Sequence, residues 1–503
     1  MGLKVVIVGG GIAGLSAAIA LRRAAGPDDD NFFEVHVYER SAFAHEVGAA
    51  IHLPPNASRP LLGWGLDPVR SGFVAVRRSY RADGATLERF HEVSHASVEG
   101  RYGAPWFFAH RVDLHEELRR LAMQEETMNG GGAPVQIHLN SEVVEFLPES
   151  SSIRLAGGQI ISGDLVIAAD GIHTNAAKTV LGHDNPPLPQ KDYNFCYRFL
   201  IPAADIASDP ATRGWLDGDD GRMKFFVSHD KRLISYPCRN NEEHNFVAMF
   251  HNSDEVAKNP EGKLESNLNK KSPLCFGAVF RPDWHASVDT SELLRRYDDF
   301  HPYLKAIMSQ RMVFSKATTV KQWALLYRPP LPTWRKASLI LIGDAAHPML
   351  PRKSSLLSHQ PHMGRERRRK TWLSKIKAKA EPKASKTAWP WESLLSGATT
   401  NPEDVASRLA LFESLRRNRC SAMQILSNAG QDEAERVREA ASKFLPIQDI
   451  PKSADEFGDF NFGYDVVQEA VAIMRRRDPD FELPHGFFQS SALLNEQQRK
   501  CHI

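Results

Sequence analysis

Three glycines and an acid near the N-terminus are the first residues whose types and spacing suit a chemical role. Gly9, Gly11 and Gly14 follow the apolar run 4–8 in the pattern Gly-x-Gly-x-x-Gly, and Glu39 ends the next β-type run. In a strand–turn–helix unit the first glycine permits the tight turn, the second lets backbone approach a pyrophosphate, and the third lets helix and strand pack closely. An acid after the second strand can accept hydrogen bonds from an unphosphorylated ribose. The pattern therefore predicts a dinucleotide site for FAD or NAD rather than NADP.

Two acids later in the chain also stand at the ends of buried-type strands. Asp170 and Gly171 follow the run 164–169, and Asp344 ends the run 338–343. An aspartate at the carboxyl end of a parallel strand faces the ligand crevice, where it can bind sugar hydroxyls. Taken alone, an acid beside a glycine is more commonly a strand-to-turn signal. Together with the N-terminal pattern, the two acids supply further sugar-binding groups for the dinucleotide.

The elements expected to position these residues are a βαβ unit and a separate sheet. Apolar residues take up helical spacing over 12–23, between the first strand and a second strand over 34–38. The middle of the chain alternates short β-type runs with Asp, Gly and Asn turns, which predicts an antiparallel sheet. These runs are 194–201, 223–227, 233–237 and 245–250. Residues 404–419 predict an amphipathic helix with an apolar face formed by Val405, Leu409, Phe412 and Leu415.

Together these motifs resemble those of the class A FAD-dependent aromatic monooxygenases, especially their salicylate hydroxylase-like fungal branch. The resemblance covers most of the chain to about residue 350. It implies an α/β fold in which a Rossmann-like FAD-binding domain carries an inserted antiparallel β-sheet substrate domain and C-terminal helices. The expected ranges are 1–184 and 326–351 for the FAD-binding domain, 185–325 for the substrate domain, 352–395 for a basic atypical segment and 396–503 for a C-terminal helical region.

The resemblance also assigns roles at the cofactor site. Ala50 lies in a segment, 46–56, that resembles the family's loop beside the flavin, and Arg111 matches an arginine that contacts the cofactor. Asp170 matches the family's Asp-Gly motif, which is linked to both FAD and the nicotinamide. The resemblance thus implies cofactor binding by Gly9, Gly11, Gly14, Glu39, Ala50, Arg111, Asp170 and Asp344. The family usually has an arginine where this chain has Ala177, and the neighbouring Lys178 is a possible substitute.

Arg198 and Tyr236 are the residues that the resemblance assigns to the substrate. Arg198 would hold a phenolate or carboxylate, and Tyr236 would hydrogen-bond it and keep the ring electron-rich. The simpler interpretations are a surface ion-pair partner for Arg198 and a core aromatic for Tyr236. The implied reaction is NAD(P)H- and O2-dependent hydroxylation of a small phenolic or enolic substrate through a flavin C4a-hydroperoxide. Epoxidation or oxidative decarboxylation on the same fold is the first alternative.

A zinc-protease pattern, HExxH, occurs at 91–95. Its chemistry requires a helix, which places the two histidines one turn apart. The flanking residues alternate like a strand, where His91 and His95 would lie about 13 Å apart. A possible third ligand, Glu116, is better explained by a capping box that Asp113 opens. We therefore expect no metal site.

The resemblance breaks after Pro351. The family continues with a Gln-Gly-Ala turn and a helix bearing Glu-Asp, but residues 352–386 contain 12 Lys and Arg and 2 acids. The tract is open to three interpretations: a solvated basic loop, a nuclear-localisation or nucleic-acid-binding arm around 365–370, or an error in the gene model. Codon degeneracy allows residues 363–373, read two bases out of phase, to encode the missing motif. We favour this last hypothesis because of that codon agreement. A nucleic-acid-binding arm is less well supported, because only Trp372 is available for base stacking. Without the motif, a catalytically impaired protein is a further alternative.

Composition is consistent with an enzyme and excludes several other classes. The 503 residues are 42% apolar with a net charge of +2, which excludes collagen-like, fibrous and wholly disordered chains and predicts two or three domains. Without the basic tract, the remaining 51 basic and 59 acidic residues give a net charge of −8. Five scattered cysteines favour a reducing compartment. We expect a cytoplasmic protein with no signal peptide, membrane span or nucleic-acid partner.

Overall fold

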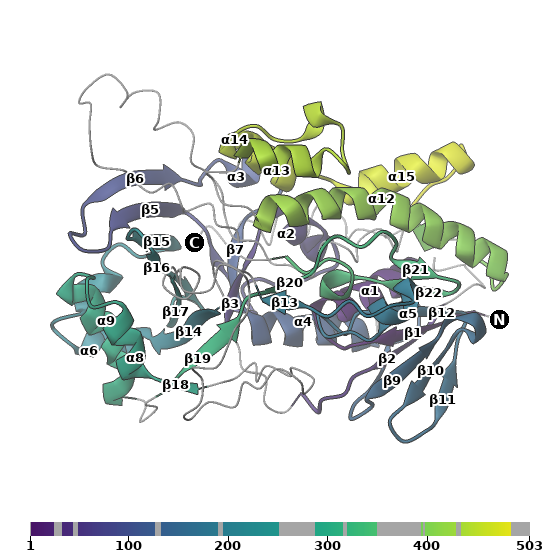
Figure 1. Ribbon diagram of the computed structural model, residues 1–503, viewed down its shortest axis with the longest axis horizontal. Helices are drawn as coiled ribbons and strands as arrows, with labels where there is room; N and C mark the ends of the chain where they lie inside the picture. The colour runs from purple at the N-terminus through teal and green to yellow at the C-terminus, as the bar shows by residue number, and fades with distance from the viewer. Residues whose placement is uncertain are drawn as a thin grey trace.

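The computed structural model describes residues 2–24, 33–43, 49–125, 132–189, 195–250, 287–314, 319–349, 394–395, 398–428 and 434–483. The elements form two lobes (Figure 1). One contains the N-terminal dinucleotide pattern on a six-stranded sheet, and the other contains an eight-stranded sheet. We call them the cofactor lobe and the substrate lobe.

The sheet of the cofactor lobe is parallel except at one edge. Its strand order is β21-β22-β12-β1-β2-β8, and β21 is the antiparallel strand. The strands are β1 (Leu3–Val8), β2 (Phe33–Tyr38), β8 (Gln136–His138), β12 (Leu165–Ala168), β21 (Arg335–Lys336) and β22 (Leu339–Leu341). Apart from Lys4, the residues of its central strands β1, β12 and β22 are all apolar, because both faces of the sheet are covered. The predicted βαβ unit is therefore confirmed.

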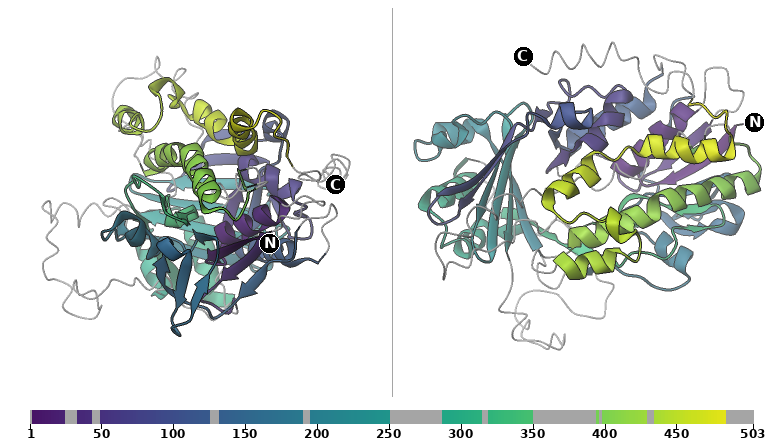
Figure 2. Two further views of the ribbon diagram at one scale, coloured as in Figure 1. Left: turned by 90° about the vertical axis from the view of Figure 1, so that its right-hand side faces the viewer. Right: turned by 90° about the horizontal axis from the view of Figure 1, so that it is seen from above.

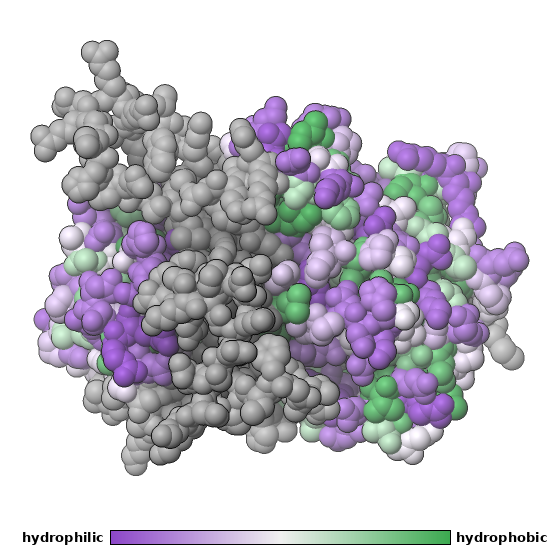
Figure 3. Space-filling model, in the orientation of Figure 1, coloured by the Kyte–Doolittle hydropathy of each residue, from purple (hydrophilic) through white to green (hydrophobic). Residues whose placement is uncertain are grey.

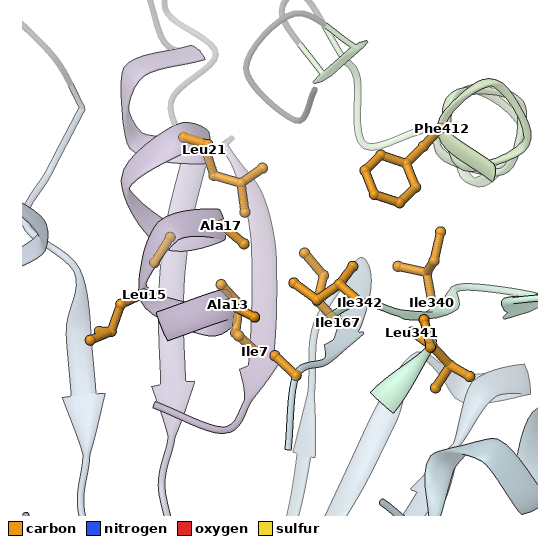
Figure 4. Close-up of a cluster of buried hydrophobic side chains, with 14 of the residues drawn as sticks. Ile7, Ala13, Leu15, Ala17, Leu21, Ile167, Ile340, Leu341, Ile342 and Phe412 are labelled. Carbon is orange, nitrogen blue, oxygen red and sulfur yellow. The ribbon is translucent and has the colours of Figure 1, made fainter. Parts of the chain in front are cut away.

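Helices cover this sheet and complete its core (Figure 4). Ala13, Ala17 and Leu21 of α1 (Ile12–Ala24) face the strands, and Phe412 of α12 (Pro402–Asn428) reaches the same core from the C-terminal part of the chain. Residues 404–419 are thus helical as predicted, and Val405, Leu409 and Phe412 are buried, whereas Arg408 and Arg416 are buried too rather than solvated. The other C-terminal helices are α13 (Ala434–Ala441), α14 (Ala454–Phe462) and α15 (Val466–Arg477). Helices α12 and α15 extend along the cofactor lobe (Figure 2).

The substrate lobe is built on a sheet with the order β18-β19-β14-β17-β16-β15-β5-β6. Its strands are β5 (Arg78–Asp83), β6 (Arg89–Ser94), β14 (Phe195–Pro202), β15 (Arg222–Val227), β16 (Lys231–Cys238), β17 (Glu243–Phe250), β18 (Ser287–Asp289) and β19 (Thr319–Ala324). All four predicted β-type runs are strands. The pairing is antiparallel except between β15 and β5. Strands β5 and β6 come from the range 1–184 that was assigned to the FAD-binding domain.

The two faces of the eight-stranded sheet have different partners. One face packs on α6 (Ala203–Ser208), α8 (Thr290–Arg296) and α9 (Pro302–Phe314) through an apolar cluster that includes Phe199, Phe246 and Leu233. The opposite face carries Arg198, Tyr236 and Asn245, and it meets the cofactor lobe through β3 (Ala50–Leu53), β7 (Phe107–His110) and β4 (Val74–Ala75).

Smaller elements complete the fold. The remaining strands are β9 (Val143–Leu147), β10 (Ser152–Leu155), β11 (Ile160–Ser162), β13 (Leu188–Pro189) and β20 (Leu326–Tyr327). The remaining helices are α2 (Pro55–Gly63), α3 (Val98–Tyr102), α4 (Arg111–Met123) and α5 (Ala176–Leu181), with 3-10 turns at Pro148–Ser150, Arg213–Leu216, Gly343–Ala345 and Ile447–Asp449. In the described part of the chain, no helix has the length and apolar character needed to cross a membrane. The described surface in Figure 3 is mostly hydrophilic, with hydrophobic side chains in small separate groups.

Candidate active site

The predicted motifs meet at the carboxyl edge of the cofactor sheet. Backbone hydrogen bonds connect the strand ends: the N–H of Ala169 donates to the carbonyl of Val8 at 2.8 Å, and the N–H of Ile342 donates to the carbonyl of Ala168 at 2.9 Å. The residues that follow β1, β12 and β22 are therefore neighbours. This edge is where doubly wound sheets bind their ligands.

The three glycines of the N-terminal pattern have different surroundings. Gly9 has a φ of +101°, and a Cβ there would lie 2.6 Å from the carbonyl oxygen of Ala169. A Cβ at Gly14 would lie 1.9 Å from the carbonyl oxygen of Gly9, so helix and strand require glycine at this position. A Cβ at Gly11, by contrast, would meet no protein atom within 4 Å. The space beside Gly11 at the start of α1 fits a phosphate approaching the backbone.

Both peptide groups of Gly10 are held by side chains from other elements. Its N–H donates to Oε2 of Glu39 at 2.8 Å, and Oε1 of Glu39 accepts from the N–H of Ser41 at 2.8 Å. Each carboxylate oxygen has more than one acceptor position, so Glu39 can still accept from a ribose. Nε2 of the buried His115 lies 2.7 Å from the carbonyl oxygen of Gly10 and donates to it when protonated. Sequence reasoning missed His115, because nothing in the local pattern connects it to a loop 105 residues away.

Asp170, Asp344 and Arg328 place charged groups at the same edge. Desolvation by the surrounding protein raises the pKa of Asp170 to about 6, although the residue keeps a solvent-exposed surface. Within the described residues, Oδ1 of Asp344 and both Nε and Nη1 of Arg328 are buried without a hydrogen-bond partner. Arg328 interacts electrostatically with Asp170. Burial, with Arg328 and Arg40 adding to it, also lowers the pKa of His173 to about 4.

These unpartnered groups fit FAD. Buried polar groups are normally hydrogen-bonded, and no described residue bonds these two guanidinium nitrogens or this carboxylate oxygen, so they suit a ligand with anionic groups and hydroxyls. FAD offers both, in its pyrophosphate and its ribityl chain. Arg328 was not among the predicted site residues. Its only sequence signal is that it lies shortly before the apolar run 338–343, which ends at Asp344.

Arg198, Tyr236 and Ala50 are brought together as one hydrogen-bonded group. Nη2 of Arg198 donates to the carbonyl oxygen of Ala50 at 2.9 Å, and the hydroxyl of Tyr236 donates to the same oxygen at 2.8 Å. The N–H of Ala50 donates to Oδ1 of the buried Asn245 at 3.1 Å. Three strands of the substrate lobe therefore hold the N–H and the carbonyl group of one residue, Ala50, of the cofactor lobe. Asn245 was not predicted.

Aromatic rings surround these backbone groups of Ala50. The ring of Tyr236 stacks on Phe108 at a centroid distance of 4.7 Å and lies 4.4 Å from the ring of His52. Burial raises the pKa of Tyr236, so its hydroxyl remains a proton donor. The interface between the lobes is therefore apolar around a few directed hydrogen bonds.

Arg111 begins α4 beside the same segment. Its N–H donates to the carbonyl oxygen of Ala49 at 3.1 Å. The predicted capping box at Asp113 and Glu116 is wrong, because the helix starts at Arg111 with His110 as its N-cap. Asp113 lies inside the first turn and forms an ion pair with Arg239 instead. A tertiary partner has thus replaced the local hydrogen bond.

The other predicted features have simple outcomes. His91 lies on strand β6, as expected from its flanks, and the buried His95 follows that strand and bonds Ser79. No group of three or more metal-ligating side chains occurs among the described residues. Lys178 pairs with Asp184 at 2.8 Å at the surface. Residues 352–386, including the basic tract and the missing motif, lie outside the described residues.

Comparisons with known proteins identify the family of this chain. Residues 7–59 match the family model described as an NAD(P)-binding Rossmann-like domain. The FAD-dependent monooxygenase cfoG of Aspergillus candidus is 36% identical over 97% of this chain and 98% of its own. The FAD-dependent monooxygenase phomE' of Diaporthe leptostromiformis is 33% identical over 88% of this chain and 98% of its own.

Solved structures show the same fold at lower identity. CtdE in complex with FAD has a TM-score of 0.62 at 17% identity and covers 95% of this chain and 99% of its own. A salicylate hydroxylase substrate complex has a TM-score of 0.60 at 18% identity and covers 93% of this chain and 97% of its own. The chain belongs to the FAD-dependent monooxygenases, and FAD is its cofactor.

Proposed function

We propose that this protein uses NAD(P)H and O2 to hydroxylate a small phenolic or enolic substrate at the interface between the two lobes. The observation that carries the proposal is the group formed by Arg198, Tyr236 and the Ala50 peptide. It joins residues expected to hold a substrate to a segment expected to lie beside the flavin. A ring bound near Arg198 and Tyr236 would therefore lie next to the cofactor.

The names of more distant relatives support a phenolic substrate. A 3-hydroxybenzoate 6-hydroxylase of Aquipseudomonas alcaligenes is 27% identical over 69% of this chain, and a hispidin-3-hydroxylase of Neonothopanus nambi is 26% identical over 94%. Both names describe a hydroxylase, and the first names a hydroxylated benzoate as its substrate. We extend this substrate class, though not a particular compound, to the present chain.

The residues of the chain would bind, orient and exclude water. Glu39, Asp344 and Arg328 would hold the ribose, ribityl and phosphate groups of FAD. FAD, when bound, supplies the electron transfer and the activation of O2. Arg198 would stabilise a phenolate or carboxylate, because a guanidinium is always charged and its planar donors match the oxygens of such an anion. The rings around Tyr236 would keep the site dry, which strengthens that interaction.

Substrate-stimulated NAD(P)H oxidation by the purified, FAD-loaded chain tests this function. A panel of hydroxylated aromatic acids and phenols should contain compounds that accelerate oxidation and yield a product heavier by one oxygen atom. Arg198→Lys should raise KM for anionic substrates more than for neutral phenols. A matched Arg154→Lys change at an exposed ion pair should leave KM unaltered. A yellow protein that no ring compound stimulates would contradict the proposed reaction.

A further inference from the structure

The first turn of α4 is joined to the substrate lobe by a bidentate ion pair. Nη2 and Nε of Arg239 donate to the two carboxylate oxygens of Asp113 at 2.8 and 2.9 Å, and Nη1 of Arg239 donates to Glu243 at 3.3 Å. Burial acts to raise the pKa of Asp113, but hydrogen bonds from Arg239 and His110 lower it to about 2. Two parallel bonds fix orientation as well as distance.

The loop that carries Arg239 is held in an unusual backbone conformation. Arg239, Asn240 and Asn241 connect β16 to β17, and their φ values are +50°, +55° and +67°. Asparagine tolerates the left-handed region, whereas arginine rarely adopts it. Such residues persist only where surrounding contacts determine them. One such contact is the N–H of Asn240, which donates to the carbonyl oxygen of Gly72 in the cofactor lobe at 3.0 Å.

The same helix contacts the dinucleotide loop one turn later. His115 lies 2.7 Å from the carbonyl oxygen of Gly10, and the N–H of Arg111 donates to Ala49 beside the Ala50 peptide. Helix α4 thus has three attachments within five residues: the β16–β17 loop, the segment before β3 and the loop that begins the FAD site. A displacement of its first turn would move all three together.

We propose that Asp113 and Arg239 are positioning residues that set α4, and through His115 the Gly10 loop, in the arrangement that binds FAD. The β16–β17 loop of the substrate lobe is then coupled to the dinucleotide site without touching the cofactor. The effect on FAD affinity rests on the cofactor site proposed above. The effect on the Gly10 loop does not, and it can be measured without cofactor.

Arg239→Gln and Asp113→Asn in the full chain test the coupling. We expect FAD binding, followed by flavin fluorescence during titration of the apoprotein, to weaken by roughly fivefold or more, the range of typical coupling between sites. Hydrogen exchange of a peptide covering residues 9–15 should be faster in both apoprotein variants than in the wild type. Arg239→Lys keeps the positive charge but loses the bidentate hydrogen bonds to Asp113. It should give intermediate values of FAD affinity and of hydrogen exchange in residues 9–15.

The control is Arg154→Gln, which removes a surface ion pair of 2.7 Å between β9 and β10. It should change neither FAD affinity nor exchange in residues 9–15. Wild-type exchange in residues 9–15 of both Arg239→Gln and Asp113→Asn would overturn the coupling. If Arg239→Gln does not fold, FAD affinity and hydrogen exchange of residues 9–15 in Asp113→Asn and Arg239→Lys test the coupling instead. A wild-type chain that binds no FAD would refute the cofactor site, while faster exchange in the variants would still support the coupling.

Discussion

Alanine substitutions at Gly11 and Gly14 distinguish a glycine required for cofactor binding from a glycine required for packing within the protein. A Cβ at Gly14 would lie 1.9 Å from the carbonyl oxygen of Gly9 and 3.3 Å from Cγ2 of Ile7, so the backbone must move. A Cβ at Gly11 would contact no protein atom within 4 Å. The two variants should therefore fail in different ways.

The expected magnitudes follow from these distances. Overpacking a close contact lowers the free energy of unfolding by about 1–3 kcal/mol, and a clash with backbone lies at the upper end. For a domain of this size, each kcal/mol lowers Tm by roughly 2–4 °C, so apo Gly14→Ala should melt several degrees below the wild type. Glycine to alanine without strain stabilises by about 0.4–1 kcal/mol, so apo Gly11→Ala should melt at or slightly above the wild-type Tm.

FAD affinity, unlike the Tm of the apoprotein, should be lowered clearly by Gly11→Ala. The methyl group of Gly11→Ala would occupy the space through which a phosphate approaches the start of α1. We expect a tenfold or greater loss of affinity, equivalent to about 1.4 kcal/mol or more. Two measurements are made on each variant: the Tm of the apoprotein by calorimetry, and the affinity for FAD by fluorescence titration. Wild-type affinity in Gly11→Ala would refute the placement of the phosphate, and a wild-type Tm in Gly14→Ala would refute the packing argument.

Three further predictions test separate parts of the account. Burial lowers the pKa of His244 to about 3 from an ordinary 6.5, so protonation favours the unfolded chain and stability should fall as pH decreases from about 6.5 toward 3. His244→Gln should flatten this dependence in Tm measurements from pH 4 to 7; an unchanged slope would count against it. Elemental analysis should find no stoichiometric zinc, and absorbance should find bound flavin; zinc without flavin would reverse the interpretation of His91 and His95. Transcript sequencing across 352–386 should reveal a frame that encodes the Gln-Gly-Ala turn, and an uninterrupted frame for the basic tract would refute that hypothesis.

Much of the fold follows from local patterns. The continuous apolar run before Gly9 and the runs before Asp170 and Asp344 predict parallel strands, because only strands buried on both faces are apolar throughout. Their acids meet because parallel strands share a carboxyl edge. The alternating runs of the substrate lobe predict its strands equally well.

The rest depends on contacts between residues far apart in the chain. Ala50 is bonded by Arg198, 148 residues away, and by Tyr236, 186 residues away. No periodicity reports such a contact. Strand β5 joins the substrate lobe by parallel pairing with β15, which no local turn signal could indicate.

Asp113 shows how a local pattern can mislead. Its spacing to Glu116 matches a capping box, and the helix is real. Arg239, 126 residues away, offers two charge-assisted bonds to the same carboxylate. Together these two bonds are stronger than one bond to a backbone N–H, and the helix begins three residues earlier than the pattern indicates.

Incorporation of isotopically labelled O2 tests the central claim most directly. The purified full chain, loaded with FAD and supplied with NAD(P)H and a stimulating phenol, should transfer one labelled oxygen atom to the product. The amount of labelled product should match the NAD(P)H consumed. A product oxygen derived from water, or NAD(P)H oxidation that yields only hydrogen peroxide with every stimulating compound, would contradict monooxygenation by this chain.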